Sequence, residues 1–228
     1  MESLYQQNGL MFWTEKEIRI RQMMVDHFVP CITQSLLGMN RAFNVQQIEA
    51  PILTPFGFIN SNYTSEDYFT LGNPSLGEII LVLRPETTMG SYRFAIEALG
   101  HGRMKMPMCI WQHGLSFRRE QDQPTKKMKL KQFYQLEFQI IYGLTTGKDY
   151  ASQVIPDTLR MMQELIGPCR EEDSDRLPSY SEGTTDIVCL KSDMEVCSIS
   201  RRNDFPDAKV LEVAIGTDRC VYNFLNKD

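Results

Sequence analysis

The chain has 228 residues, 42% of them hydrophobic and 23% charged, as in an ordinary globular protein, and we expect residues 1–228 to form a single domain. A net charge of −5 excludes a general attraction to nucleic acid, so any such contact would need a local basic patch. The sequence has no apolar run long enough to span a membrane and no signal-peptide pattern at its start. Its six cysteines are scattered without a Cys-x-x-Cys pair, which argues against a zinc site and a disulfide framework and fits a cytoplasmic protein.

The first quarter of the chain predicts one long helix and one strand. Residues 15–37 carry apolar side chains at approximately helical spacing, Thr14 can cap that helix, and Pro30 is expected to kink or break it. A strand is expected over 44–52 and a loop with short helical pieces over 54–75.

A short apolar strand is then predicted over 79–83, followed by a helix over 89–99 with Gly100 beyond its end. Between them lies Leu-Arg-Pro-Glu-Thr-Thr, in which Glu86 follows a proline that stiffens the turn. A carboxylate at a strand end is suited to binding an amine, although an ordinary charged turn would have the same sequence.

Two strand-like runs joined by a long basic loop predict an antiparallel hairpin between Pro107 and Tyr142. Period-two alternation places Phe133, Gln135 and Glu137 on one face of the return strand. We interpret this face as the lining of a ligand site, although the exposed face of a plain hairpin also alternates.

The first strand of the hairpin ends in Phe-Arg-x-Glu, which places Arg118 two residues before Glu120. The guanidinium is a planar fork able to hold a phosphate, with a carboxylate beside it. The loop that follows contains the densest basic cluster of the chain, Lys126, Lys127, Lys129 and Lys131. These lysines could hold a few phosphates or could simply be solvated.

The second half predicts a helix over 149–166, a solvated charged linker over 168–178 and a strand over 187–190. Glu195 and Arg202 follow, and they could form an ion pair at a strand end.

A last strand begins at Val210 and runs through Glu212 into Gly216, where a helix starts. Arg219 therefore falls in the first turn of that helix, beside exposed backbone amides, a position suited to phosphate.

In their order along the chain these segments resemble the catalytic core of the class II aminoacyl-tRNA synthetases. The helix and proline-ended strand resemble motif 1, the hairpin resembles motif 2, and Gly216-Thr217-Asp218-Arg219 resembles motif 3. Leu-Arg-Pro-Glu-Thr, with the segments 180–186 and 194–205, resembles the glycyl enzymes and their class IIa relatives. The departures from the glycyl pattern are Gly183 and Ser200, each in place of alanine, Ser198 in place of glycine, and Val213 and Ala214 in place of proline and serine.

The resemblance implies an α+β fold with an antiparallel sheet of about six strands flanked by helices, and a homodimer built through motif 1. It also implies ATP and Mg²⁺ as cofactors. In the family's pattern, Arg118 would hold the α-phosphate and the substrate carboxylate, and Arg219 the γ-phosphate. Phe133 would stack on adenine, and Glu120 would contact its amino group.

The resemblance further assigns an amino-acid site to a set of charged residues, namely Glu86, Glu137, Glu195, Arg202 and Glu212. Glu212 would contact Mg²⁺ or the substrate ammonium. Several carboxylates around one pocket suit a small amino acid whose main handle is its amine, with glycine ahead of alanine and serine.

These assignments predict ATP-dependent formation of an aminoacyl-adenylate. The alternative is a synthetase-like binding subunit without chemistry, such as a polymerase accessory factor or a regulator. The presence of both Arg118 and Arg219 favours the enzyme.

Because the chain ends at Asp228, soon after Arg219, we expect no anticodon-binding domain. The acceptor would then be a tRNA acceptor stem, a carrier protein, a small amine or a modified nucleic acid.

Overall fold

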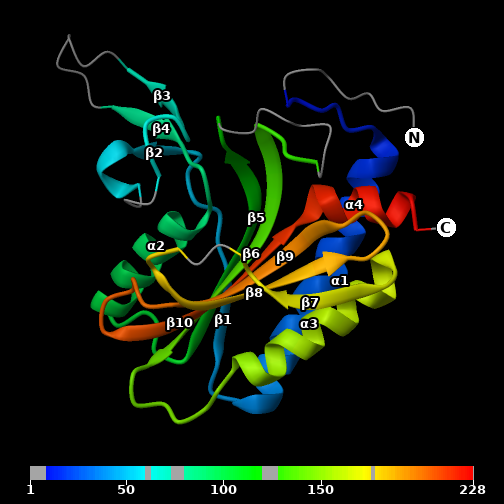
Figure 1. Cartoon of the computed structure of the whole chain (residues 1–228). Coiled ribbons are helices and arrows are strands. Elements are labelled where there is room, and N and C mark those ends of the chain that lie inside the picture. Colours follow the sequence, from blue (N-terminus) through cyan, green and yellow to red (C-terminus); the bar gives the residue numbers. More distant parts are fainter. Residues whose placement is uncertain (1–8, 60–62, 73–79, 120–127, 176–177, 228) are drawn as a thin grey trace.

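The computed structural model describes residues 9–59, 63–72, 80–119, 128–175 and 178–227, and a seven-stranded sheet runs through its centre (Figure 1). The strands lie in the order β1, β5, β6, β10, β9, β8, β7. Every neighbouring pair is antiparallel except β1 and β5, which are parallel. In sheet order the bounds are Asn44–Gln47, Met108–Phe117, Gln132–Gly143, Ala208–Gly216, Met194–Arg202, Ser181–Cys189 and Cys169–Asp173.

A smaller sheet and four helices complete the described part of the chain. The small sheet has the order β2 (Leu53–Pro55), β4 (Leu81–Leu83), β3 (Phe69–Leu71), and a 3-10 turn, Phe56–Phe58, follows β2. The helices are α1 (Glu15–Met39), α2 (Thr88–Gly100), α3 (Ala151–Ile166) and α4 (Thr217–Leu225). The predicted α+β mixture is therefore observed, with seven strands in the main sheet rather than about six.

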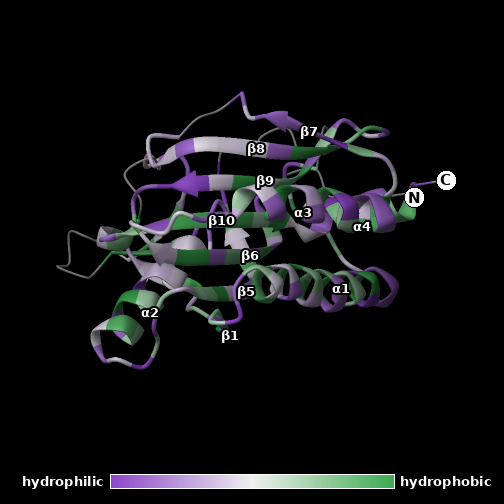
Figure 2. Ribbon diagram, turned by 90° about the horizontal axis from the view of Figure 1, so that it is seen from below, coloured by the Kyte–Doolittle hydropathy of each residue, from purple (hydrophilic) through white to green (hydrophobic). Residues whose placement is uncertain are grey.

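The two faces of the main sheet have different partners. Helices α1, α3 and α4 contact one another and pack on one face, where residues such as Phe28, Met162 and Leu211 are buried in the larger core (Figure 2). Helix α2 covers one end of the opposite face through a second core that includes Ala95 and Val210. The rest of that opposite face is left for the functional site. Within the described part of the chain, no helix combines the length and apolar character needed to cross a membrane.

The hairpin between Pro107 and Tyr142 is confirmed. Strands β5 and β6 pair from Met108 with Ile141 to Phe117 with Gln132. The N-terminal helix is also confirmed, and at its start the Glu17 carboxylate accepts the Thr14 N–H at 2.7 Å.

Of the two effects predicted for Pro30, a kink or a break, the break does not occur, since α1 continues through it. The proline lies on the exposed face of the helix, whereas Phe28 and Ile32 on either side are buried in the core. Packing of the buried face therefore holds the helix together, and the carbonyl that loses its partner at Asp26 lies on an exposed residue.

Two predicted strands have different bounds from those expected. The strand over 44–52 ends at Gln47, because the Ala50 N–H turns to the Gln112 side chain and Pro51 has no N–H to donate. The strand predicted over 187–190 starts earlier and ends one residue sooner, since β8 runs over Ser181–Cys189.

Other boundaries also shift. The loop expected over 54–75 contains β3 and the 3-10 turn, and Gly100 is the last residue of α2 rather than lying beyond it.

The charged linker predicted over 168–178 is wrong in its first half, since Cys169–Asp173 forms strand β7. This strand pairs with β8 from Cys169–Cys189 to Asp173–Thr185. Four of its five residues are exposed and polar, so it has no apolar alternation that would reveal a strand. Charged residues are typical of edge strands, where they discourage pairing with another chain.

Candidate active site

A cavity of about 790 Å³ lies on the sheet face opposite the larger core. Its floor comes from β6, β10, β9 and β8, its sides include the Glu86 turn and the first turn of α4, and residues of β7 reach its rim. Phe133, Gln135 and Glu137 all line it, as their alternation on β6 predicts.

The floor consists of two rows of small and polar side chains that cross the sheet. Strand registers place Glu137 opposite Ala214, Ala214 opposite Ser198, and Ser198 opposite Asp186. The second row comes from positions two residues away on each strand, namely Gln139, Glu212, Ser200 and Thr184, of which Gln139 is fully buried and the other three line the cavity. Alternation within strands and register between them therefore gather one polar surface from four strands.

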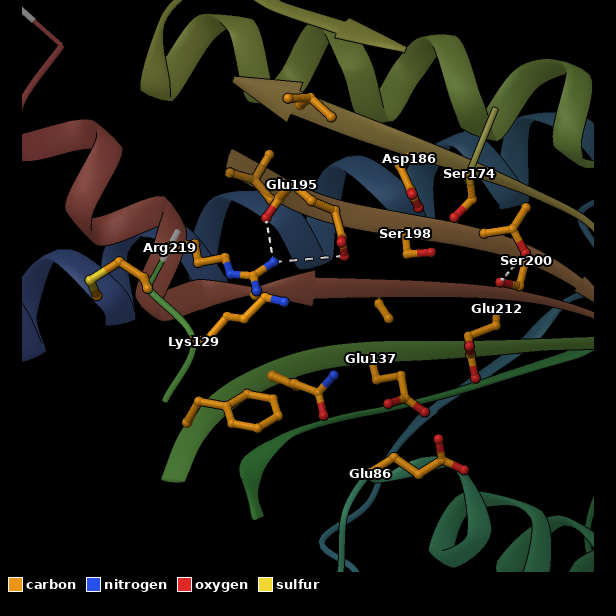
Figure 3. A pocket seen from close by; sticks show the side chains of 18 of the residues that line it. Glu86, Lys129, Glu137, Ser174, Asp186, Glu195, Ser198, Ser200, Glu212 and Arg219 are labelled. Carbon is orange, nitrogen blue, oxygen red and sulfur yellow. Dashed lines mark hydrogen bonds and ion pairs between the residues drawn. The ribbon is translucent and has the colours of Figure 1, made fainter. Parts of the chain in front are cut away.

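Three glutamates meet at one end of this floor (Figure 3). Thr88 donates its hydroxyl to Glu137 at 2.6 Å and contacts Glu212 at 2.9 Å, and the Gln139 amide also reaches both carboxylates, at 2.6 and 2.8 Å. Glu86 faces them from the turn before α2. Two neutral donors therefore hold the Glu137 and Glu212 carboxylates close together.

Burial and mutual repulsion raise the pKa values of two glutamates in the carboxylate cluster, Glu86 and Glu137. Burial, followed by the charges of Glu212 and Glu86, raises the pKa of Glu137 to about 7. Burial also raises the pKa of Glu86, and its Oε1 atom has no hydrogen-bond partner among the described residues. The buried Gln139 Oε1 is likewise unpaired within the described residues. Buried acceptors without donors are costly, so the cluster is arranged to receive a cationic or donor group.

Arg202 lies beneath this cluster and is buried. Its guanidinium pairs with Glu212 at 2.8 Å and with Asp204 at 2.6 Å, and it stacks 3.8 Å from the Tyr180 ring centroid. The sequence left open an ion pair between Arg202 and Glu195, and the structure gives them different partners. Glu195 lies instead near Arg219, at 3.8 Å. Arg202 therefore supports the floor through Glu212.

Three cationic side chains, Arg118, Lys129 and Arg219, also line the cavity. The Arg118 Nε donates to the Pro85 carbonyl at 3.1 Å, and its guanidinium carbon lies 5.3 Å from the Phe133 ring centroid. Arg219 and Lys129 extend over the floor (Figure 3). The Arg219 Nη1 donates to the backbone carbonyl of Glu195 at 2.7 Å.

A buried ion pair fixes the start of α4 and with it the position of Arg219. Arg21 of α1 contacts Asp218 at 2.9 Å, and the other Asp218 oxygen accepts the Tyr134 N–H, also at 2.9 Å. Burial raises the pKa of Asp218 to about 6, against the lowering effects of the Tyr134 N–H and the Arg21 charge. The Thr217 hydroxyl donates to the Tyr134 carbonyl at 3.1 Å. The helix start is therefore tied to both α1 and β6.

Two residues expected to contact ATP or Mg²⁺, Glu120 and Glu212, are not seen in a free ligand-binding position. Glu120 lies outside the described residues, as do Lys126 and Lys127. Glu212, expected near Mg²⁺, already contacts Arg202, Thr88 and Gln139. No group of three His, Cys, Asp or Glu residues arranged to hold a metal occurs within the described ranges.

Several residues of the site were not singled out from the sequence. Thr87 and Thr88 directly follow Glu86, and Gln139 continues the alternation of β6, so a closer inspection of those two segments would have included them. Tyr63 comes from an irregular segment and carries no such signal, whereas Tyr180 begins the resemblance segment 180–186. Asp186 is part of the resemblance segment 180–186 and lies on the floor beside Ser198.

The fold is that of the class II aminoacyl-tRNA synthetase catalytic domain, as comparison with solved structures shows. Prolyl-tRNA synthetase from Cryptosporidium parvum, complexed with halofuginone and AMPPNP, superposes with a TM-score of 0.74 over 96% of this chain and 48% of its own, at 14% identity. A Bacillus halodurans protein described as an ATP phosphoribosyltransferase regulatory subunit/histidyl-tRNA synthetase superposes with a TM-score of 0.69 over 96% of this chain and 83% of its own, at 12% identity.

Sequence comparison finds glycine–tRNA ligases over part of the chain. The protein of Mesoplasma florum is 30% identical over 111 residues, and that of Mycolicibacterium paratuberculosis is 31% identical over 122 residues. These matches cover 46% and 51% of this chain but only 25% and 26% of the relatives' own length. No family model matches the chain.

Proposed function

We propose that the protein joins a small amino acid, glycine first, to ATP and forms an aminoacyl-adenylate and pyrophosphate. The observation that carries this proposal is the charge distribution of one cavity, in which Lys129 and Arg219 lie at one end and three buried glutamates lie at the other, with Arg118 next to the Glu86 turn. An amino acid beside ATP presents the complementary pattern of an ammonium at one end and phosphates at the other.

In this proposal the ammonium lies against Glu86, Glu137 and Glu212, where it supplies the donor that the buried Glu86 Oε1 lacks among the described residues. Arg118 holds the substrate carboxylate and the α-phosphate together, so one carboxylate oxygen bonds to the α-phosphorus as the bond to the pyrophosphate oxygen breaks. No general base is needed, because the carboxylate is already ionised. Arg219 holds the γ-phosphate, and Phe133 stacks on adenine.

We assign Mg²⁺ to Asp186 and Glu195 in place of Glu212. Asp186 lies on the cavity floor with no hydrogen-bond or ion-pair partner among the described residues, and its charge acts on Glu195 of the neighbouring strand. Mg²⁺ is commonly held by one or two carboxylates together with substrate phosphates, and there it neutralises the leaving pyrophosphate.

The test is amino-acid-dependent exchange of pyrophosphate into ATP, screened over all twenty amino acids. Glycine or a near neighbour should give the highest rate, and a preference for a large or aromatic amino acid would contradict the proposal. Arg118→Ala should abolish exchange, since it removes a charge-assisted contact made in the transition state. Arg119→Ala is the matched control, because Arg119 is exposed and does not line the cavity.

The second candidate function is that of a binding subunit that catalyses no reaction. It is favoured by the structural similarity to the Bacillus halodurans protein, which is described as a regulatory subunit/histidyl-tRNA synthetase. ATP binding without exchange for any amino acid would support that candidate.

We also propose that a tRNA acceptor end or another nucleophile takes the aminoacyl group, and that two chains associate. Charging of total tRNA with labelled glycine and sedimentation of the purified protein test these points.

A further inference from the structure

Tyr63 lies between Glu86 and Arg118, two residues that line the cavity. Its hydroxyl donates to the Glu86 Oε2 at 2.8 Å and accepts from the Arg118 Nη2 at 3.3 Å. Its ring also faces the Arg118 guanidinium, 5.8 Å from the centroid. Burial raises the pKa of Tyr63 well above its usual range, so the hydroxyl keeps its proton and remains a donor. One hydroxyl thus joins the residue proposed to grip phosphate to a residue proposed to bind ammonium.

We propose that Tyr63 is a positioning residue for amino-acid activation, which sets the direction of the Glu86 carboxylate and couples it to Arg118. This inference rests on the proposed function. Of the two Glu86 oxygens, Oε2 is occupied by Tyr63 and Oε1 is buried without a partner among the described residues. Tyr63 therefore leaves one defined oxygen for an incoming ammonium. The same contact limits rotation of Arg118, whose Nε is held by the Pro85 carbonyl one residue before Glu86.

The contact also affects the protonation of Glu86. Burial raises the pKa of Glu86, and the hydrogen bond from Tyr63 opposes that rise because it favours the charged carboxylate. The other charged or titratable groups that face Glu86 are Arg118, Glu137, Tyr180, Arg202 and Glu212. Removal of the Tyr63 hydroxyl should raise the pKa of Glu86 further, so a larger share of the protein would be protonated there and unable to bind an ammonium near neutral pH.

The variant Tyr63→Phe removes the hydroxyl and keeps the ring, and Tyr68→Phe is its matched control. Tyr68 belongs to the same segment and is buried, and its hydroxyl has no hydrogen-bond partner in the described part of the chain. In pyrophosphate exchange with glycine, Tyr63→Phe should lower kcat/KM for the amino acid by roughly tenfold or more, as expected for a hydrogen bond to a charged group. The acid limb of its pH profile should move to higher pH, and the KM for ATP should change less. Tyr68→Phe should match the wild type in all three.

A second measurement does not depend on activity. Infrared difference spectra between acid and neutral pH contain a band from the protonated Glu86 carboxyl group, and the band that is missing in Glu86→Gln is the one that belongs to Glu86. The pH at which this band has lost half its intensity, its midpoint, should be higher in Tyr63→Phe than in the wild type. An unchanged midpoint, or an unchanged pH profile in an active enzyme, overturns the role of Tyr63. A wild type that shows no exchange overturns the proposed function, and the infrared midpoint then decides the Tyr63 contact separately.

Discussion

Replacing Glu137 by glutamine should remove much of the pH dependence of stability. Glu137 is buried, and its carboxylate accepts hydrogen bonds from Thr87, Thr88 and Gln139. Its pKa is raised from 4.5 to about 7 in the folded protein. Folding therefore favours the protonated form. The stabilisation from this proton is complete below the unfolded pKa and is lost as the pH rises through about 7.

The size of the effect follows from the shift. A rise in pKa from 4.5 to about 7, at roughly 1.4 kcal/mol per pKa unit, corresponds to about 3.5 kcal/mol, a large part of the roughly 5–15 kcal/mol that stabilises a typical domain. Glu137→Gln has nearly the same shape and no ionisable proton, so its free energy of unfolding should fall less between pH 5 and 8. Asp218, with its pKa also raised, remains in both proteins and should leave a residual slope of the same sign.

Urea unfolding at a series of pH values measures this difference. The two proteins should diverge as the pH rises, with Glu137→Gln the more stable of the two above pH 7. Equal slopes across this range would refute the argument that Glu137 is desolvated beside Glu212 and Glu86. Saturating glycine should reduce the wild-type slope, because an ammonium beside the cluster favours the charged carboxylates.

Three further predictions concern single residues. Arg219→Ala should raise the KM for ATP in pyrophosphate exchange more than it lowers kcat, and an unchanged KM would argue against γ-phosphate contact. Asp186→Asn should increase the Mg²⁺ concentration needed for half-maximal exchange, since it removes one of two carboxylates proposed to hold the ion, and an unchanged requirement would exclude this site. Gly114→Ala should destabilise the fold by roughly 1–3 kcal/mol in urea unfolding, because a Cβ there would overlap the buried Arg84 guanidinium, and wild-type stability would show that Arg84 can move.

Local patterns in the sequence were sufficient for the hairpin and for the strand-to-helix turns that carry Glu86 and Arg219. Alternation of Phe133, Gln135 and Glu137 has a period of two that holds within a single strand, so it is readable without knowledge of the neighbours. Strand β7 could not be predicted in this way, because its exposed, charged residues form a strand only through pairing with β8.

The sequence by itself determined which residue types are available, their spacing, and most of the helices and strands. Only the tertiary structure decided which charges meet. Arg202 pairs with Glu212 rather than Glu195 because the register of β9 against β10 brings Arg202 and Glu212 to one face, two residues apart across the sheet. The contacts of Tyr63 with Glu86 and Arg118 join three separate segments of the chain. Such contacts depend on strand order and long-range packing, which no local periodicity encodes, and they set the protonation and direction of the groups in the cavity.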